Sequence, residues 1–251
     1  MFAAKGGFLY LAPAEGGFGN NSFWTGATDQ YLSVPSTTQL ITWKATTGYT
    51  IEYWFYATAW PGTINPGPGN QDAGGTNYWS FGPANAGAIE FYYWGSGTKY
   101  LKTATGAASL NTWNNIAFVA TTVGSTATMS IYLNGVRQNV QLDNTGTFEQ
   151  TKSVTNGVVA TGTPFRMGRY GSTRWTTFYM DNLRVSNVNR YSGASYTLAT
   201  QPFTVDASTQ LYLICNGANG STTFTDSSTF NRTVTNNLNR VTQTNAKANH
   251  T

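Results

Sequence analysis

Apolar and polar residues alternate most regularly near the middle of the chain. In one run Ile116, Phe118 and Ala120 fall on a single face, and the run from Met129 to Leu133 alternates in the same way. This period of two is typical of half-buried strands. The dipeptide Asn134-Gly135 that follows favours a tight type I′ turn, because both residues tolerate a positive φ. The segment therefore predicts three antiparallel strands, the third beginning just after the turn.

Further short apolar runs, separated by Gly, Pro, Asn and Ser, predict more strands. They are residues 8–11, 23–24, 31–34, 49–58, 77–81, 88–94, 98–103, 164–170, 176–185 and 209–215, with weaker ones at 222–224 and 232–235. Bulky side chains alternate on both faces of the run 49–58, so we expect that strand to be covered on both sides.

Two of these runs make a more specific prediction. We expect 164–170 and 176–185 to pair with each other around an exposed turn. Strict alternation along the second run would place Phe178, Met180, Asn182 and Arg184 on one face.

So many short strands predict an all-β fold, a two-sheet antiparallel β-sandwich or jelly roll. With 251 residues, 40% of them apolar, the chain can bury one large core. We expect a single domain over residues 21–235, with residues 1–20 as an N-terminal arm or edge strand and 236–251 as a polar C-terminal tail. Residues 60–76, rich in Pro and Gly, predict a long exposed loop.

Charge and cysteine content narrow the classes of partner. Only 10% of the residues are charged and the net charge is +4, without a basic run, so we expect no nucleic-acid partner. Cys215 is the only cysteine, which excludes an internal disulfide, and its apolar surroundings predict a buried side chain. No apolar run approaches 18 residues, so we expect no membrane span.

The acidic residues do not form a catalytic motif. None of the ten lies two positions from another, as paired carboxylates on one strand would require, and the single histidine, His250, lies in the expected tail. We therefore predict no enzyme activity and no catalytic residue; a glycan hydrolase whose carboxylates meet only in space is the alternative.

Cofactors are likewise not expected, with calcium as the one open alternative. Asn70 and Asp72 could offer oxygen ligands from the 60–76 region. The alternative is that these side chains only support turn geometry.

Aromatic residues beside predicted loops are the remaining functional candidates. Exposed rings stack on sugars and anchor protein interfaces, and otherwise cap the ends of a sandwich core. The candidates for contact with a glycan or a protein partner are Trp60, Tyr78, Trp79, Trp94 and Trp175.

Three segments resemble the laminin-G-like or concanavalin A-like jelly roll. They are 49–56 (YTIEYWFY), then 113–117 (WNNIA) leading to 131–135 (IYLNG), and 167–169 followed by 179–187 and Arg190-Tyr191. Asn182 stands where the family usually has Glu. The resemblance implies a jelly-roll fold.

Arg190-Tyr191 and the segment Thr222–Ser228 also resemble copies of this domain in structural proteins of tailed bacteriophages. That resemblance implies a non-enzymatic virion protein, a capsid decoration or fibre-associated protein on the virion surface, made in the host cytoplasm. Its partners would be capsid or tail proteins and a cell-surface glycan, and it would form a homo-oligomer such as a trimer. The alternative is an extracellular lectin-like carbohydrate-binding module of a secreted or cell-surface protein.

Overall fold

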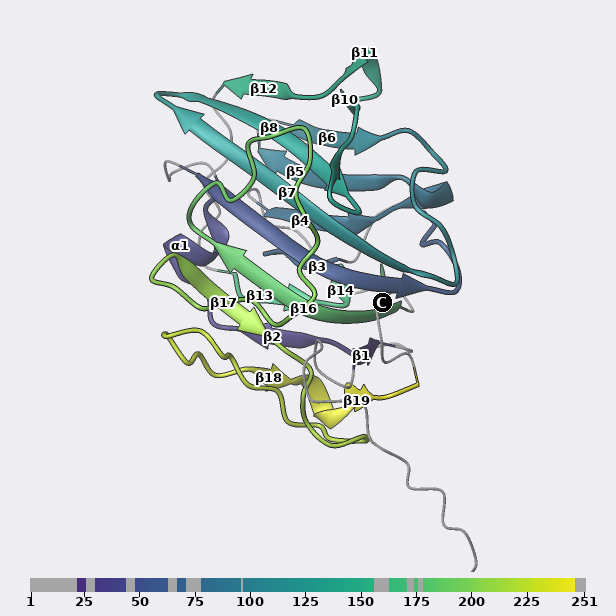
Figure 1. Ribbon diagram of the computed structural model, residues 1–251, viewed down its shortest axis with the longest axis vertical. Helices are drawn as coiled ribbons and strands as arrows, with labels where there is room; N and C mark the ends of the chain where they lie inside the picture. The colour runs from purple at the N-terminus through teal and green to yellow at the C-terminus, as the bar shows by residue number, and fades with distance from the viewer. Residues whose placement is uncertain are drawn as a thin grey trace, which may run out of the picture.

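The computed structural model describes residues 22–25, 30–43, 48–62, 67–70, 78–95, 97–155, 163–170, 174–175 and 178–246. Over these residues the chain is almost entirely β-structure, in antiparallel sheets that stack into a sandwich (Figure 1). The helical elements there are single turns: α1 (Thr38–Ile41), η1 (Asn85–Gly87) and η2 (Asn237–Asn239).

Sheet A, the larger sheet, has nine strands in the described part of the chain. In spatial order they are β12 (Lys152–Thr155), β8 (Thr126–Leu133), β7 (Trp113–Val123), β3 (Tyr49–Ala57), β16 (Phe178–Ser186), β1 (Ser22–Thr25) and β19 (Thr242–Thr244), with β9 (Val136–Arg137) beside β8 and β17 (Thr209–Leu213) beside β16. It lies in front in Figure 1.

Sheet B lies behind sheet A in the same view (Figure 1). Its order is β11 (Thr145–Glu149), β10 (Val140–Leu142), β6 (Gly97–Thr103), β5 (Ile89–Gly95) and β4 (Tyr78–Pro83). Gly69 bridges both Ser80 of β4 and Arg166, and so connects sheet B to a smaller sheet. That sheet contains β13 (Phe165–Met167), β2 (Leu32–Val34) and β18 (Thr235–Asn236); β14 (Arg169–Tyr170) and β15 (Arg174–Trp175) form a separate pair.

The predicted central hairpins are confirmed. β7, β8 and β9 are consecutive antiparallel strands, with Ile116 opposite Leu133. Asn134 and Gly135 have φ values of 49° and 78°, as a type I′ turn requires. The Asn134 side chain also accepts a hydrogen bond from the Asn115 amide at 2.8 Å. Local alternation and this turn are therefore enough to set the register here.

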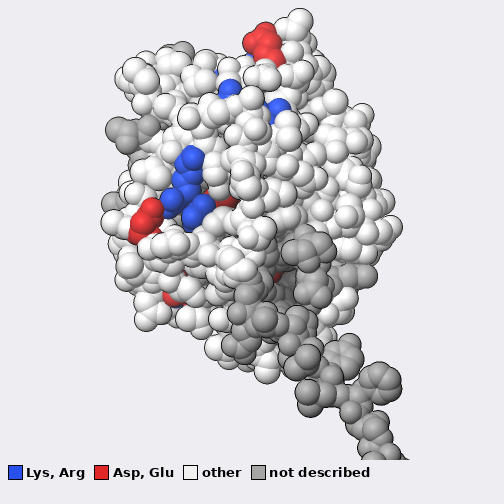
Figure 2. Space-filling model, in the orientation of Figure 1, with Lys and Arg blue, Asp and Glu red and all other residues white. Residues whose placement is uncertain are grey.

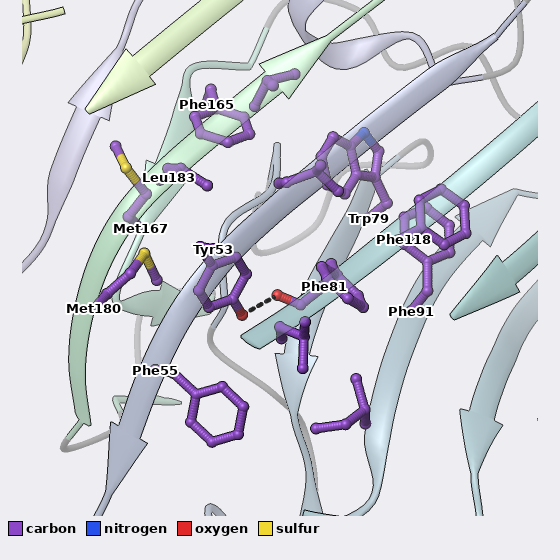
Figure 3. Packing of buried hydrophobic residues seen from close by; sticks show 14 of the residues in the cluster. Tyr53, Phe55, Trp79, Phe81, Phe91, Phe118, Phe165, Met167, Met180 and Leu183 are labelled. Atoms are coloured by element: carbon purple, nitrogen blue, oxygen red, sulfur yellow. Dashed lines mark hydrogen bonds between the residues drawn. The ribbon is translucent and has the colours of Figure 1, made fainter. Parts of the chain in front are cut away.

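The core fills the space between sheets A and B (Figure 3). Phe91 of β5 stacks on Phe118 of β7, with ring centroids 3.7 Å apart and planes 2° apart. The Tyr53 hydroxyl donates to the Phe81 carbonyl at 2.8 Å, which ties β3 to β4 across the core. Cys215 is buried, as predicted.

The expected alternation along β16 is wrong, because the strand contains a β-bulge. Its pairing with β3 shifts register between Asp181 and Arg184, and Asn182 has a φ of 51°. The extra residue returns Leu183 to the core and places Arg184 directly opposite Glu52 on the outer face. Asparagine tolerates this left-handed conformation better than most residues, which accounts for Asn182 at this position.

Other predictions need correction. Residues 164–170 and 176–185 do not pair: β13 joins β2, whereas β16 lies between β3 and β1 in sheet A. The 60–76 region is not wholly exposed, since residues 67–70 are buried. The expected tail contributes β19 to sheet A and the buried Val241 to the core. The expected arm at residues 1–20 lies outside the described residues.

Candidate functional site

Aromatic side chains gather on the outer face of sheet B, the face turned away from the core. Strand register places Tyr78 opposite Trp94 and Tyr92 opposite Tyr100. The Tyr78 ring is parallel to that of Trp94, within 5° and with centroids 6.2 Å apart, and it stacks on Tyr92 at 5.7 Å. Tyr92 meets Tyr100 edge to face at 5.1 Å. Tyr78, Trp94 and Tyr100 are half-buried, whereas Tyr92 is buried.

A hollow of about 300 Å³ adjoins this aromatic face. Tyr100 belongs to both, and Glu90 and Lys102 lie opposite each other two residues further along β5 and β6, on the same face. The hollow, here called the end pocket, is lined by Gly62, Ala84, Asn85, Ala88, Glu90, Tyr100, Lys102, Thr105 and Asn144. Glu90 is buried, and Lys102 is half-buried. The end pocket therefore combines one ring, two opposite charges and side-chain amides.

The turn Asn85–Gly87, whose first residue Asn85 lines the end pocket, is held in an unusual conformation. Ala86 and Gly87 have φ values of 53° and 76°. The Ala86 carbonyl accepts a hydrogen bond from Gly106 at 2.7 Å. A Cβ on Gly87 would lie only 3.0 Å from the Trp60 ring, so that ring packs against the turn. Left-handed conformations at non-glycine residues are often retained at ligand sites.

Charged side chains on the outer face of sheet A instead make contacts that stabilise the fold. Figure 2 shows this face, on which charged side chains are sparse. Residues 187–208, here called the strap, connect β16 to β17 in the sequence. They cross the outer face of sheet A (Figure 1). Tyr191 of the strap donates to the Glu52 carboxylate at 2.5 Å, and Tyr196 donates to Asn115 at 2.5 Å. The expectation that β3 is covered on both faces is therefore confirmed.

Beneath the strap lies a buried ion pair. The Arg184 guanidinium donates twice to one Glu52 oxygen, at 2.8 and 2.6 Å, and stacks over the Phe203 ring at 3.7 Å. Arg190 makes a more exposed pair with Asp206 at 2.7 Å. Its guanidinium holds the pKa of the Asp206 carboxyl well below the usual range. The carboxylates that the sequence supplies to this face thus have structural partners.

The tyrosines on this face predict loss of stability at high pH. Burial raises the pKa of Tyr191, and the nearby Glu52 charge raises it further; burial also raises the pKa of Tyr196 and Tyr212. In the unfolded chain tyrosine ionises near about pH 10. A group whose pKa is higher in the folded state contributes stability below the unfolded value and loses it above.

We therefore expect the urea concentration at the midpoint of unfolding to be lower at pH 11 than at pH 8. Tyr191→Phe should show a smaller fall over that range than the wild type, because one ionising group is removed. Equal midpoints at the two pH values would contradict the prediction.

A family model described as the concanavalin A-like lectin/glucanases superfamily matches residues 25–193. The chain belongs to this superfamily. The match includes sheet B, the end pocket and the start of the strap. No curated protein matches the chain in sequence.

Several solved structures resemble the chain at low sequence identity. A heptameric SAP-like pentraxin from Limulus polyphemus is 16% identical, with a TM-score of 0.44, over 68% of this chain and 78% of the pentraxin. A protein of Bacteroides ovatus, named as a candidate carbohydrate binding protein, is 15% identical, with a TM-score of 0.49, over 89% of this chain and 58% of its own. A leech intramolecular trans-sialidase is 14% identical, with a TM-score of 0.41, over 59% of this chain and 22% of the enzyme.

The structure separates the five predicted aromatic candidates. Tyr78 and Trp94 lie together on the outer face of sheet B. Trp60 is half-buried and packs against the core and the turn Asn85–Gly87. Trp175 pairs through its backbone with Arg169, and its side chain lies outside the described residues.

The expectation of an exposed ring is wrong for Trp79. It is 1% exposed and stacks on Phe91 inside the core, with centroids 5.5 Å apart. The cause is strand alternation, because Trp79 follows Tyr78 directly and therefore points to the opposite face.

The calcium candidates are placed only in part. Asn70 is buried, and its side-chain oxygen accepts a hydrogen bond from the Trp79 amide at 2.9 Å. Its amide nitrogen donates to Thr163 at 3.4 Å. Asp72 lies outside the described residues. Across the described part of the chain, no group of three or more His, Cys, Asp or Glu side chains could hold a metal ion.

The sequence prediction did not include Tyr92, Tyr100, Glu90, Lys102 and Asn85. A signal was present for the first four, because residues two apart in a strand share a face and β5 pairs with β6 from Gly95 opposite Gly97. Among the described residues, no helix is both long and apolar enough to cross a membrane.

Proposed function

We propose that the chain is a non-enzymatic glycan-binding protein whose site is the outer face of sheet B. One observation supports this most: half-exposed rings of Tyr78, Trp94 and Tyr100 lie beside a pocket lined by charged and amide groups. Sugars present apolar C–H faces and hydroxyl edges, and this face offers a partner for each. Membership of a superfamily that includes lectins agrees with the proposal.

Trp94→Ala tests the proposal directly. An aromatic anchor at the centre of a binding surface is typically worth about 2 kcal/mol, or about thirtyfold in Kd. We expect a glycan array to identify a ligand for the wild type, and calorimetry to show at least that loss for Trp94→Ala.

Phe230→Ala is the matched control, because Phe230 is also an exposed ring, 49% exposed, on the segment that contacts β17 of sheet A. Its affinity should equal that of the wild type. The proposal would be refuted if no glycan bound, or if Trp94→Ala bound as well as the wild type.

The proposal of a non-enzymatic role rests on where the carboxylates lie. Glu52 is held by Arg184, and Asp181 accepts a hydrogen bond from the Cys215 amide at 3.2 Å. Asp226 accepts the Tyr212 and Ser228 amides at 3.0 and 2.9 Å. These contacts support structural roles for all three. Incubation with a panel of β-glucans should release no reducing ends, and release that stops on Glu90→Gln would overturn the proposal.

We further propose a virion surface as the setting, from the resemblance to domains of tailed-bacteriophage structural proteins. The residues on which that resemblance rests make contacts that stabilise the fold. Tyr191 donates a hydrogen bond to Glu52, and Asp226 fixes the loop that follows β17. Such contacts fit any protein with this fold, so the setting needs a direct test. The purified chain should co-sediment with capsids or tails, and failure to co-sediment with any particle would refute the setting.

A further inference from the structure

The single turn η2, which follows β18, presents an apolar side chain on a strained backbone. Leu238 and Asn239 both have a φ of 53°, and the Arg240 amide donates to the Asn237 carbonyl at 3.2 Å. Two positive φ values are typical of a type I′ turn, in which Gly, Asn and Asp are the usual residues. Asn239 follows that preference. Leu238 does not, because a bulky side chain raises the energy of the left-handed conformation.

Burial does not offset this strain at Leu238. Its side chain is 66% exposed, so folding removes little of its apolar surface from water. Asparagine or glycine would relieve the strain without the loss of a buried contact. Neither backbone conformation nor packing therefore accounts for a leucine at this position. Strained residues of this kind are concentrated at binding sites.

The turn is held in place by Asn236. Its side-chain amide donates to the carbonyls of Thr222 and Val241, at 2.8 and 2.7 Å, and its side-chain oxygen accepts a hydrogen bond from the Val241 amide at 3.0 Å. Val241 is itself fully buried in the core. Leu238 is thus presented on a preformed turn, at the end of the sandwich where β18 and β19 lie (Figure 1). A preformed turn reduces the ordering cost of binding.

A similar segment, residues 230–232 (Phe-Asn-Arg), precedes residues 238–240 (Leu-Asn-Arg) and makes its contacts within the chain. Asn231 has its one positive φ, a conformation that asparagine tolerates. The Arg232 guanidinium stacks over the Phe230 ring at 4.3 Å, so the basic and apolar side chains contact each other. The earlier segment is therefore a matched control for the later turn.

Charge indicates the kind of partner that the turn fits. Arg240 is exposed and belongs to none of the ion pairs among the described residues. The carboxylates of Glu149, Asp206 and Asp226 are each paired with a basic side chain of the same chain. A second copy would have to break such a pair to contact Arg240 with one of these carboxylates. An acidic partner of a different kind complements both Arg240 and the net charge of +4.

We propose that Leu238 and Arg240 form a docking surface for a protein that has an apolar pocket bordered by carboxylates. Leu238 would enter the pocket, and Arg240 would contact its acidic border. The inference rests on the proposed virion setting, so the partner is a capsid or tail protein. It does not use the glycan-binding face of sheet B.

Leu238→Asn tests the role of the apolar side chain with two measurements. Asparagine relieves the strain, so the midpoint of thermal unfolding should rise by about 2 °C. Co-sedimentation with purified capsids and with purified tails should show an affinity about tenfold lower than that of the wild type, as expected for the loss of one buried leucine. Leu238→Met keeps an apolar side chain and should bind within about threefold of the wild type. A lower midpoint for Leu238→Asn would overturn the inference, because the leucine would then serve the fold.

Arg240→Gln tests the role of the charge. At about 0.1 M salt this variant should bind about threefold more weakly than the wild type, and the difference should disappear at about 1 M salt, where charges are screened beyond about 3 Å. Lys152→Gln removes the same charge from β12 of sheet A, and Phe230→Ala removes the exposed ring of the earlier segment. Both controls should bind as the wild type does. Unchanged binding by Arg240→Gln at low salt would refute the acidic border.

The outcomes separate the docking surface from the proposed setting. If the wild type co-sediments with a particle and Leu238→Asn does so equally well, the setting stands and the docking surface falls. If the wild type co-sediments with neither capsids nor tails, both fall. Sedimentation velocity of the chain alone tests the other occupant. Self-association that Leu238→Asn abolishes would identify a second copy as the partner and would contradict the inference.

Discussion

Arg184→Met should lower the free energy of unfolding by about 3–5 kcal/mol, as measured by urea denaturation at pH 7. Arg184 is the charged partner of Glu52, and the two side chains are 8% and 1% exposed. Methionine would fill much of the same space, but the buried Glu52 carboxylate would keep the neutral Tyr191 hydroxyl as a donor and lose its ion pair. Desolvation of an unpaired charge accounts for the size of the effect.

Arg190→Met is the matched control for this variant. Its partner Asp206 is 49% exposed, so water can replace the lost contact, and we expect a change of about 1 kcal/mol or less. The double variant Glu52→Gln/Arg184→Met should be more stable than Arg184→Met alone, because glutamine leaves no buried charge. If Arg184→Met lowered the free energy of unfolding by less than about 1 kcal/mol, the stabilising role given to the Glu52–Arg184 ion pair would be contradicted.

The central hairpins could be predicted because every signal for them is local. The alternation from Ile116 to Ala120 and the Asn134-Gly135 turn can each be recognised within a few consecutive residues. The same reasoning would have aligned β5 with β6, since Gly95 lies opposite Gly97. With that register, the sequence alone identifies Glu90 and Lys102 as neighbours.

Other features depend on contacts that alternation does not encode. β19 is a short polar strand, which forms because β1 lies beside it at the edge of sheet A. The bulge at Asn182 reverses the apparent faces of β16. Trp79 shares its face of β4 with Phe81, whereas Tyr78 shares the other with Ser80, but the prediction placed both rings beside a loop and did not use this alternation. Asn85 and Asn144 reach the end pocket from separate loops.

These differences explain why the family motif identifies the fold without locating the site. Its residues Glu52, Arg184 and Tyr191 meet under the strap on sheet A. The candidate site lies on the opposite side of the sandwich, on strands β4, β5 and β6. The two sheets are joined through the core, so the site depends on how firmly β5 is held against β7.

Phe118→Ala should test that connection, with a loss of about 3–5 kcal/mol in the free energy of unfolding. Phe118 is fully buried and stacks on Phe91 of β5 at 3.7 Å. It also contacts Trp43 edge to face, with centroids 5.9 Å apart. Alanine would leave a cavity between the two sheets, where close packing on both sides limits relaxation.

Phe148→Ala is the control, because Phe148 is 42% exposed on β11 and its loss should change stability by no more than about 0.5 kcal/mol. Urea denaturation gives both values. Because Phe91 alternates along β5 with Tyr92, movement of β5 into the cavity would also displace the outer rings. A Phe118→Ala variant that is folded at 10 °C should therefore bind glycan more weakly than the wild type. If this variant were as stable as the wild type, the role given to the Phe91–Phe118 stack would be contradicted.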